Sequence, residues 1–203
     1  MNTRKTQLHP NQYFHIYNRG INSQDIFFES KNYNYFLEKY IQFVAPFVHT
    51  YAYCLLKNHF HLLIQVKNEG ELQEAIQKKK EKAYYWHISN AFANWFKSYS
   101  HSINKMYGRT GSLFEEPFRR IEVTNDAYFS TLVAYIHQNP EKHGFIDDFR
   151  DYPHSSYGSY LVDKPTRLRK KDVLDWFGCW EDYQTFHTVN NRQPTAISDV
   201  LFD

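Results

Sequence analysis

The chain has 203 residues, 42% of them hydrophobic and 23% charged, which is typical of one globular domain with short appendages. Its formal net charge of +2 neither requires nor excludes a nucleic-acid partner. No apolar run approaches the roughly 20 residues of a membrane span, and the polar first residues lack the apolar core of a signal peptide. The two cysteines, Cys54 and Cys179, are far apart and match no metal-binding spacing. We therefore expect a reduced protein of the cytoplasm with no membrane partner.

Hydrophobic periodicity divides the chain into strands, with a period of two, and helices, with a period of 3.6. Ser30 is the expected N-cap of the first helix, and Pro46 and Pro140 are expected to stop the first and third helices. Lys57-Asn58 is either a two-residue hairpin connection or part of one bulged strand. In chain order we expect strands at 13–17, 49–56, 59–66 and 118–123, and helices at 31–44, 69–99, 125–139, 155–161 and 171–180.

This order of elements is that of a split β-α-β sandwich. The prediction is an α+β, ferredoxin-like or RRM-like fold: an antiparallel sheet with helices on one face, plus a helical C-terminal extension. We expect a catalytic domain at 1–160 and the extension at 161–203. The other face of the sheet would be free, and in nucleic-acid-binding proteins of this architecture that face is the binding platform, although a fold alone does not assign a function.

His59-Phe60-His61, at the start of a predicted strand, is the most informative short motif. Side chains at i and i+2 of a strand share one face, roughly 6 to 7 Å apart, which suits two imidazoles that bind one divalent metal ion. With 11 His in 203 residues, such a triplet can also arise from composition alone. The motif therefore needs support from other residues.

That support comes from the helix at 125–139, where Tyr135 and Asn139 share one face, one turn apart. Two imidazoles and an amide oxygen leave open positions for phosphate oxygens and water, as suits Mg²⁺ or Mn²⁺ acting as a Lewis acid. A tyrosine at such a metal could attack a phosphodiester and form a covalent phosphotyrosine. The alternatives are that Tyr135 packs the helix on the sheet and that Asn139 only ends the helix before a proline.

Basic residues supply further candidates. Alternation in the strand at 118–123 sends Arg119 and Arg120 to opposite faces, and Lys57 or Arg119 could add positive charge at a metal site. The lysine-rich run at 78–82 is expected to be a solvated helical face rather than a phosphate-binding surface.

Four ordered segments together resemble the single-tyrosine HUH transposases, and most closely the branch associated with repeated extragenic palindromes. The resemblance covers roughly residues 10–160, and the ordered set is far more specific than any single segment. The segments are Leu56–Ile64, Gly111–Phe114, Tyr135–Pro140 and Asp151–Tyr157.

The resemblance implies an endonuclease and strand transferase that acts on single-stranded or hairpin DNA. His59 and His61 would be the metal ligands, Asn139 would take the place of the third ligand, and Tyr135 would be the nucleophile. Family members are often homodimers and sometimes monomers. The candidate DNA contacts are Lys57, Arg119, Arg120, Lys142 and Tyr157.

Two positions depart from the family pattern. Glu-Lys-His-Gly follows Pro140 where a basic residue and Ala more often precede Gly, and His154 stands where Trp is usual. Neither departure touches the proposed chemistry, but both put the details of hairpin contact in doubt.

Two other functions stay open. One is a binding protein that recognises hairpin DNA or RNA without cutting, through surface aromatics and basic residues. The other is a metal phosphodiesterase in which water, and not Tyr135, attacks the phosphorus.

Overall fold

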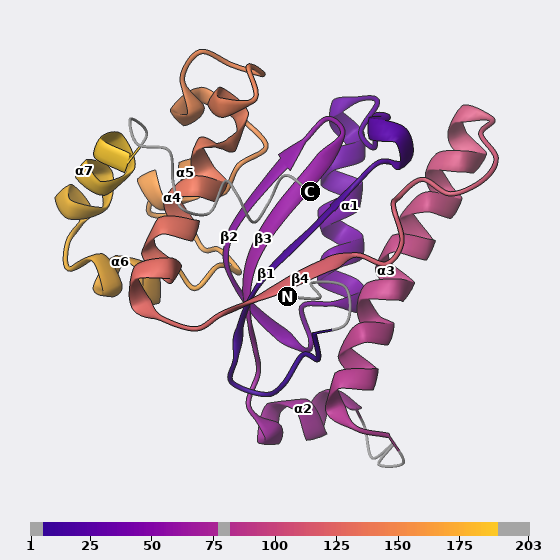
Figure 1. The fold of residues 1–203 in the computed structure, drawn as a ribbon, viewed down its shortest axis with the longest axis horizontal. Coiled ribbons are helices and arrows are strands. Elements are labelled where there is room, and N and C mark those ends of the chain that lie inside the picture. The colour runs from indigo at the N-terminus through magenta and orange to yellow at the C-terminus, as the bar shows by residue number, and fades with distance from the viewer. Residues whose placement is uncertain (1–5, 77–81, 191–203) are drawn as a thin grey trace.

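The computed structural model describes residues 6–76 and 82–190, which form a four-stranded sheet with helices on both faces (Figure 1). Every pair of neighbouring strands is antiparallel, in the order β2-β3-β1-β4. The strands are β1 (Tyr13–Arg19), β2 (Val48–Leu56), β3 (His59–Val66) and β4 (Arg119–Val123), and the helices are α1 (Ser30–Phe43), α2 (Glu69–Ile76), α3 (Tyr84–Tyr107), α4 (Asp126–Lys142), α5 (Tyr157–Leu161), α6 (Lys170–Phe177) and α7 (Trp180–Asn190). The α+β fold with C-terminal helices is confirmed.

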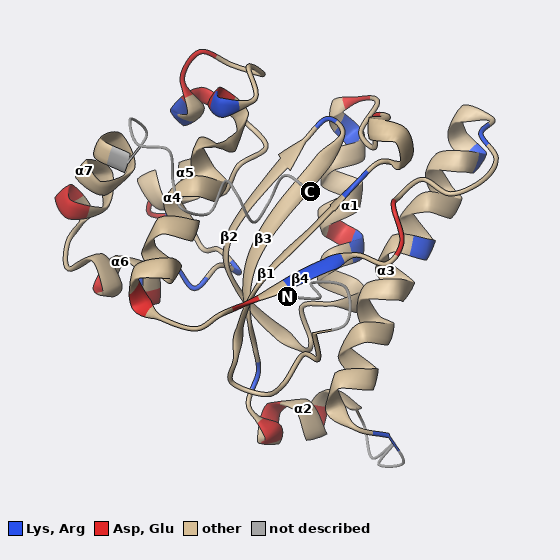
Figure 2. Ribbon diagram, in the orientation of Figure 1, with Lys and Arg blue, Asp and Glu red and all other residues tan. Residues whose placement is uncertain are grey.

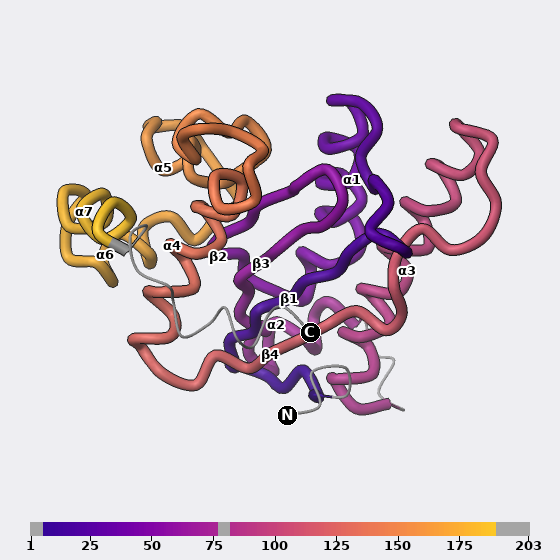
Figure 3. The backbone as a smooth tube through the Cα atoms, turned by 45° about the horizontal axis from the view of Figure 1, so that its top comes forward, coloured from indigo at the N-terminus to yellow at the C-terminus, as the bar shows by residue number. Residues whose placement is uncertain are grey.

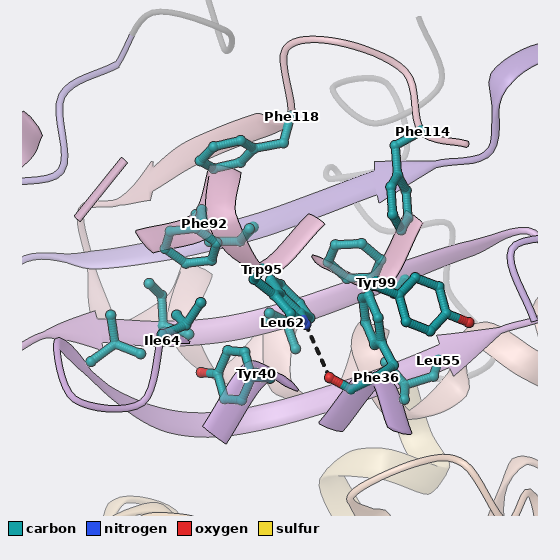
Figure 4. Close-up of a cluster of buried hydrophobic side chains, with 14 of the residues drawn as sticks. Phe36, Tyr40, Leu55, Leu62, Ile64, Phe92, Trp95, Tyr99, Phe114 and Phe118 are labelled. Atoms are coloured by element: carbon teal, nitrogen blue, oxygen red, sulfur yellow. Dashed lines mark hydrogen bonds between the residues drawn. The ribbon is translucent and has the colours of Figure 1, made fainter. Parts of the chain in front are cut away.

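Helices α1 and α3 cover one face of the sheet and enclose an aromatic core (Figure 4). The indole Nε1 of Trp95 in α3 donates a hydrogen bond to the carbonyl oxygen of Phe36 in α1, at 3.0 Å. Phe36 also contacts Phe60, with 5.2 Å between ring centres. Phe60 is the central residue of the His-x-His motif, and its complete burial on this face turns both flanking histidines toward the opposite face.

The opposite face, which the sequence predicted to be free, is covered by α4 and the C-terminal helices (Figures 1 and 3). Leu132, Val133 and Ile136 of α4 pack in one cluster with Leu63 of β3. Every residue of α4 from 132 to 140 is buried. A helix that is buried on all sides needs packing partners on all sides. Here the sheet covers one side of α4, and α5 to α7 cover the other.

The segment between α4 and α6 also lies along the outer edge of β2. The backbone N–H of Leu55 donates to His154, and that of Ser156 donates to Tyr53. His154, which stands where the family usually has Trp, stacks on Tyr33 with ring centres 3.6 Å apart. An aromatic ring at this position thus joins the C-terminal segment to α1.

The start of α1 and the end of α4 differ from the prediction. Glu29, and not Ser30, is the N-cap of α1, in a capping box with Asn32. Pro140 lies inside α4, and the N–H of His143 donates to the carbonyl of Asn139, so the helix continues to Lys142. A proline removes only one hydrogen bond, and this one falls in the last turn.

The single helix expected at 69–99 is instead two helices, α2 and α3. Ala83 has extended backbone angles, so the helical pattern is interrupted before Tyr84. Helix α3 continues past the predicted end to Tyr107, where Gly108 takes a positive φ of 62°. Most of the lysine-rich run, 78–81, lies outside the described residues. Among the described helices, none is long and apolar enough to cross a membrane.

Candidate active site

The two histidines of the motif line a cavity of about 190 Å³ at the end of the sheet. Strand β3 pairs with β1 so that His61 lies opposite Tyr17 and His59 lies opposite Arg19. Arg119 reaches the same cavity from β4. The cavity is therefore built from three adjacent strands, and its floor is the face of the sheet that α4 covers elsewhere.

Helix α4 supplies the remaining candidate residues from above. The ring of Tyr135 meets that of His61 edge to face, with 5.6 Å between ring centres and 83° between planes. One turn later, Oδ1 of Asn139 lies 3.2 Å from Nε2 of His59. The structure thus brings together all four residues that the sequence assigned to metal binding and nucleophilic attack. Their roles remain predictions.

The hydrogen bonds of His59 suit it to bind a cation. Its Nδ1 lies 2.7 Å from Oδ1 of Asn58, an acceptor, so Nδ1 carries the proton and Nε2 presents a lone pair. In this tautomer the lone pair and Oδ1 of Asn139 face each other, while Nδ2 of Asn139 is buried without a hydrogen-bond partner in the structure. A cation bound between Nε2 and Oδ1 fits these two atoms.

A divalent metal fits these donor atoms. Burial lowers the pKa of His59 to about 4 and that of His61 well below its usual range, so both imidazoles are neutral at pH 7. Two atoms that bind one octahedral ion at about 2.1 Å lie about 3 Å apart, close to the observed 3.2 Å. Within residues 6–76 and 82–190, no three His, Cys, Asp or Glu side chains are grouped to hold a metal. A metal here would need the amide oxygen of Asn139.

The phenol of Tyr135 lies in a partly desolvated place. Burial raises the pKa of Tyr135 to about 12, and a side-chain hydrogen bond with Asn139 offsets part of this rise. The ammonium of Lys142 lies 5.2 Å from the centre of the Tyr135 ring, and its own pKa is lowered, mainly by desolvation. Lys142 is therefore a neighbour of the candidate nucleophile as well as a candidate DNA contact.

The two arginines of β4, the blue strand in Figure 2, lie on opposite faces as predicted. Arg120 is directed toward α3, where it donates to Oγ of Ser89 at 2.9 Å and lies over the ring of Phe118. It lines a larger cavity, of about 830 Å³, on that side of the sheet. Asn18 of β1 lines both cavities, which lie on opposite faces of the sheet.

Comparison with known proteins gives two likenesses. No model of a known protein family matches the chain. A protein of Haemophilus influenzae named "Putative REP-associated tyrosine transposase" is 28% identical over 108 residues, which are 53% of this chain and 58% of that protein. A solved structure of a REP-associated tyrosine transposase bound to a REP hairpin superposes with a TM-score of 0.60 and 15% identity, over 81% of this chain and 88% of that one.

The chain resembles the REP-associated tyrosine transposases. The resemblance inferred from four sequence segments is thereby confirmed, in sequence by one protein and in fold by another. The matched region spans 58% of the length of the Haemophilus influenzae relative, and the low identity of the solved structure shows the fold alone.

Like Arg120, the candidate DNA contacts Tyr157 and Lys57 do not line the cavity at His59 and His61. Tyr157 is buried, with 2% of its surface exposed, and packs against Phe149 and His137. Tyr183 and His187 of α7, in the helical extension, also cover its ring, so in this structure Tyr157 is not available to DNA. Lys57 is in the exposed β2–β3 turn and pairs with Asp25 at 2.9 Å.

Sequence reasoning missed several residues at the cavity. His143 meets His59 edge to face, with 5.0 Å between ring centres. Its position four residues after Asn139 is the signal that could have found it. His15 and Tyr17, on one face of β1, stack beside His61. Their alternation was visible in the sequence, but only the register of β1 against β3 reveals that they reach the motif.

Proposed function

We propose that this protein is a metal-dependent endonuclease and strand transferase for single-stranded DNA, in which Tyr135 forms a 5′-phosphotyrosine near a DNA hairpin. The observation that supports this most strongly is the meeting of Tyr135 and Asn139 from α4 with His59 and His61 from β3 at one cavity. A protein that only binds DNA has no need of this whole set. The metal would be Mg²⁺ or Mn²⁺, held by His59, His61 and Asn139.

In the proposed reaction, Oη of Tyr135 attacks the scissile phosphorus and loses its proton. The bond from phosphorus to the 3′ oxygen breaks, and that oxygen takes up a proton to become a free 3′-OH. One phosphoester bond replaces another, so a 3′-OH can later attack the phosphotyrosine and rejoin a strand without ATP. The contact of the Tyr135 ring with His61 of the same chain supports attack within one chain.

The surroundings of Tyr135 must overcome its raised pKa. When bound, the metal would supply Lewis-acid charge that stabilises the phosphate and the departing 3′ oxygen. Lys142 supplies positive charge close to the Tyr135 ring, where developing phenolate charge is favoured. Arg119, at the cavity wall, is placed to bind a phosphate next to the scissile one.

The rest of the chain would hold the DNA and the catalytic helix. We propose that residues 1–160 form the catalytic unit and that the extension from 161 onward braces α4. His187 of α7 lies 2.9 Å from His137, which is on the side of α4 opposite to Tyr135. The larger cavity at Arg120 is a candidate place for DNA bases close to the cut site.

A denaturing gel with labelled single-stranded hairpin oligonucleotides tests this function. The wild type should form a covalent adduct with Mn²⁺ but not with EDTA, and Tyr135→Phe should form none. Tyr128→Phe is a matched control, because Tyr128 lies two turns earlier in α4 and does not line the cavity. Cleavage that survives in Tyr135→Phe would favour attack by water, and specific hairpin binding without cleavage would favour the binding protein.

A further inference from the structure

We propose that His15 is a positioning residue that accepts the Nδ1–H of His61 and thereby keeps Nε2 of His61 free to bind the metal. The inference rests on the proposed function, because it assigns a partner to one of the proposed metal ligands. His15 lies on β1, 46 residues before His61.

The contact between the two rings is short and completely buried. Nε2 of His15 lies 2.9 Å from Nδ1 of His61, and His15 has no exposed surface. The β1–β3 register pairs His15 with Leu63 and Tyr17 with His61, so His15 is the diagonal neighbour of His61 on the same face. Tyr17 stacks on His15 with 4.8 Å between ring centres, which fixes the plane of the ring.

Only one arrangement of protons in this pair permits metal binding. A hydrogen bond between two neutral imidazoles contains one proton, carried by one of the two nitrogens. If His15 donated it, His61 would carry its own proton on Nε2, and that atom could not bind a metal. If His61 donates from Nδ1, its Nε2 keeps a lone pair that can bind a metal. Metal-binding histidines usually donate their second ring N–H to such an acceptor.

Core packing alone does not explain a histidine at this position. Nδ1 of His15 is buried without a hydrogen-bond partner. A buried polar atom left in this way costs free energy, and a phenylalanine ring would fill similar space without that cost. The other ring nitrogen of His15, Nε2, makes its hydrogen bond with His61, which favours a role for His15 in positioning that proposed metal ligand.

Variants at position 15 separate positioning from packing. His15→Phe keeps an aromatic ring but removes the acceptor. His15→Gln keeps an acceptor, because its amide oxygen can stand near the place of Nε2. His187→Gln is a matched control, since His187 is equally buried but belongs to α7, away from the cavity. His61→Ala tests the metal site itself.

The first readout is Mn²⁺ affinity, measured from free Mn²⁺ by electron paramagnetic resonance with no DNA present. We expect His15→Phe to weaken Mn²⁺ binding by about 10- to 100-fold, the range for loss of such a partner. His15→Gln should recover most of the affinity, and His187→Gln should match the wild type. Circular dichroism in EDTA would show that each variant is folded.

The second readout is the ¹⁵N spectrum of the ring nitrogens in Mg²⁺-loaded protein, which distinguishes protonated from unprotonated nitrogens. We expect a proton on Nδ1 of His61 and none on Nε2 of His15. A proton on Nε2 of His15, or unchanged Mn²⁺ affinity in folded His15→Phe, would overturn the inference while the metal site stands. If wild type and His61→Ala bind Mn²⁺ equally weakly, the metal site is wrong and the inference fails with it.

Discussion

Nε2 of His59 lies 3.2 Å from Oδ1 of Asn139, although 80 residues separate these two in the chain. In the tautomer that donates from Nδ1 of His59 to Asn58, Nε2 keeps a lone pair, so this nitrogen and the amide oxygen of Asn139 both suit a bound cation. The pair links the hairpin strand β3 to helix α4, which carries Tyr135.

Replacing Asn139 should weaken metal binding more than it harms the fold. We expect Asn139→Ala to lower Mn²⁺ affinity by about tenfold or more, because one ligand oxygen is lost. A ligand that binds only the folded state raises its stability, so Mn²⁺ should raise the melting temperature of the wild type but not of the variant. Gln138→Ala is the control: its side chain bonds α7, so this variant should lose stability and keep its response to Mn²⁺. Equal Mn²⁺ responses in wild type and Asn139→Ala would contradict the assignment.

Arg119 should contribute to DNA affinity through a phosphate. We expect Arg119→Ala to weaken binding of single-stranded DNA for all sequences alike and to reduce the slope of log affinity against log salt by about 0.7 to 1. Fluorescence anisotropy across a salt series measures both quantities. Arg150→Ala is the matched control, since Arg150 pairs with Asp148 on the surface. Equal salt slopes for wild type and Arg119→Ala would show that Arg119 contacts no phosphate.

Buried histidines between α4 and α7 should make the fold sensitive to acid. Burial lowers the pKa of His187 to about 4 and that of His137 well below its usual range. In the unfolded chain each of these histidines binds a proton below about pH 6.5. In the folded chain both stay neutral, so the free energy of unfolding falls as the pH drops from about 6.5 toward 4. For His187 alone the loss between pH 7 and 5 is about 2 kcal/mol.

Urea denaturation at pH 7 and pH 5 measures this loss. His187→Gln should be less stable than the wild type at pH 7, because hydrogen bonds to His137 and to the backbone are lost. The free energy of unfolding of the same variant should also change less with pH, because one of the titrating histidines has been removed. A wild type as stable at pH 5 as at pH 7 would show that these histidines are not held neutral.

The aromatic core should depend on the hydrogen bond of Trp95 as well as on its volume. Trp95 is fully buried, and its Nε1 bonds the carbonyl oxygen of Phe36. We expect Trp95→Phe to lower the free energy of unfolding by about 2 to 3 kcal/mol, from the lost hydrogen bond and the space left. Tyr85→Phe, at a partly exposed ring in the same helix, should change it by less than about 0.5 kcal/mol. Similar losses for both variants would contradict this core.

The strands and the grouping of the candidate catalytic residues could be predicted because their signals are local. His59 and His61 are two residues apart in a strand, and Tyr135 and Asn139 are four apart in a helix, so each pair shares a face whatever the rest of the fold does. The ordered family segments then connected the two pairs. Lys57-Asn58 was predicted to be either a hairpin connection or part of one bulged strand, and the structure contains the hairpin.

The remaining features depend on tertiary contacts that local patterns do not contain. Helix α4 covers the face expected to be free, because its second apolar side is matched by the C-terminal helices. For the same reason Tyr157 is buried rather than available to DNA. His15 and His61 come together only in the exact register of β1 against β3. Both faces of these strands are buried, so the hydrophobic pattern does not define that register.

The most direct measurement is mass spectrometry of the protein after reaction with a single-stranded hairpin oligonucleotide and Mn²⁺, followed by nuclease and protease digestion. We predict a nucleotide remnant attached through phosphate to the peptide that contains Tyr135, together with a DNA product that ends in a free 3′-OH. A remnant on another tyrosine, or cleaved DNA that carries a free 5′-phosphate and no protein, would contradict attack by Tyr135.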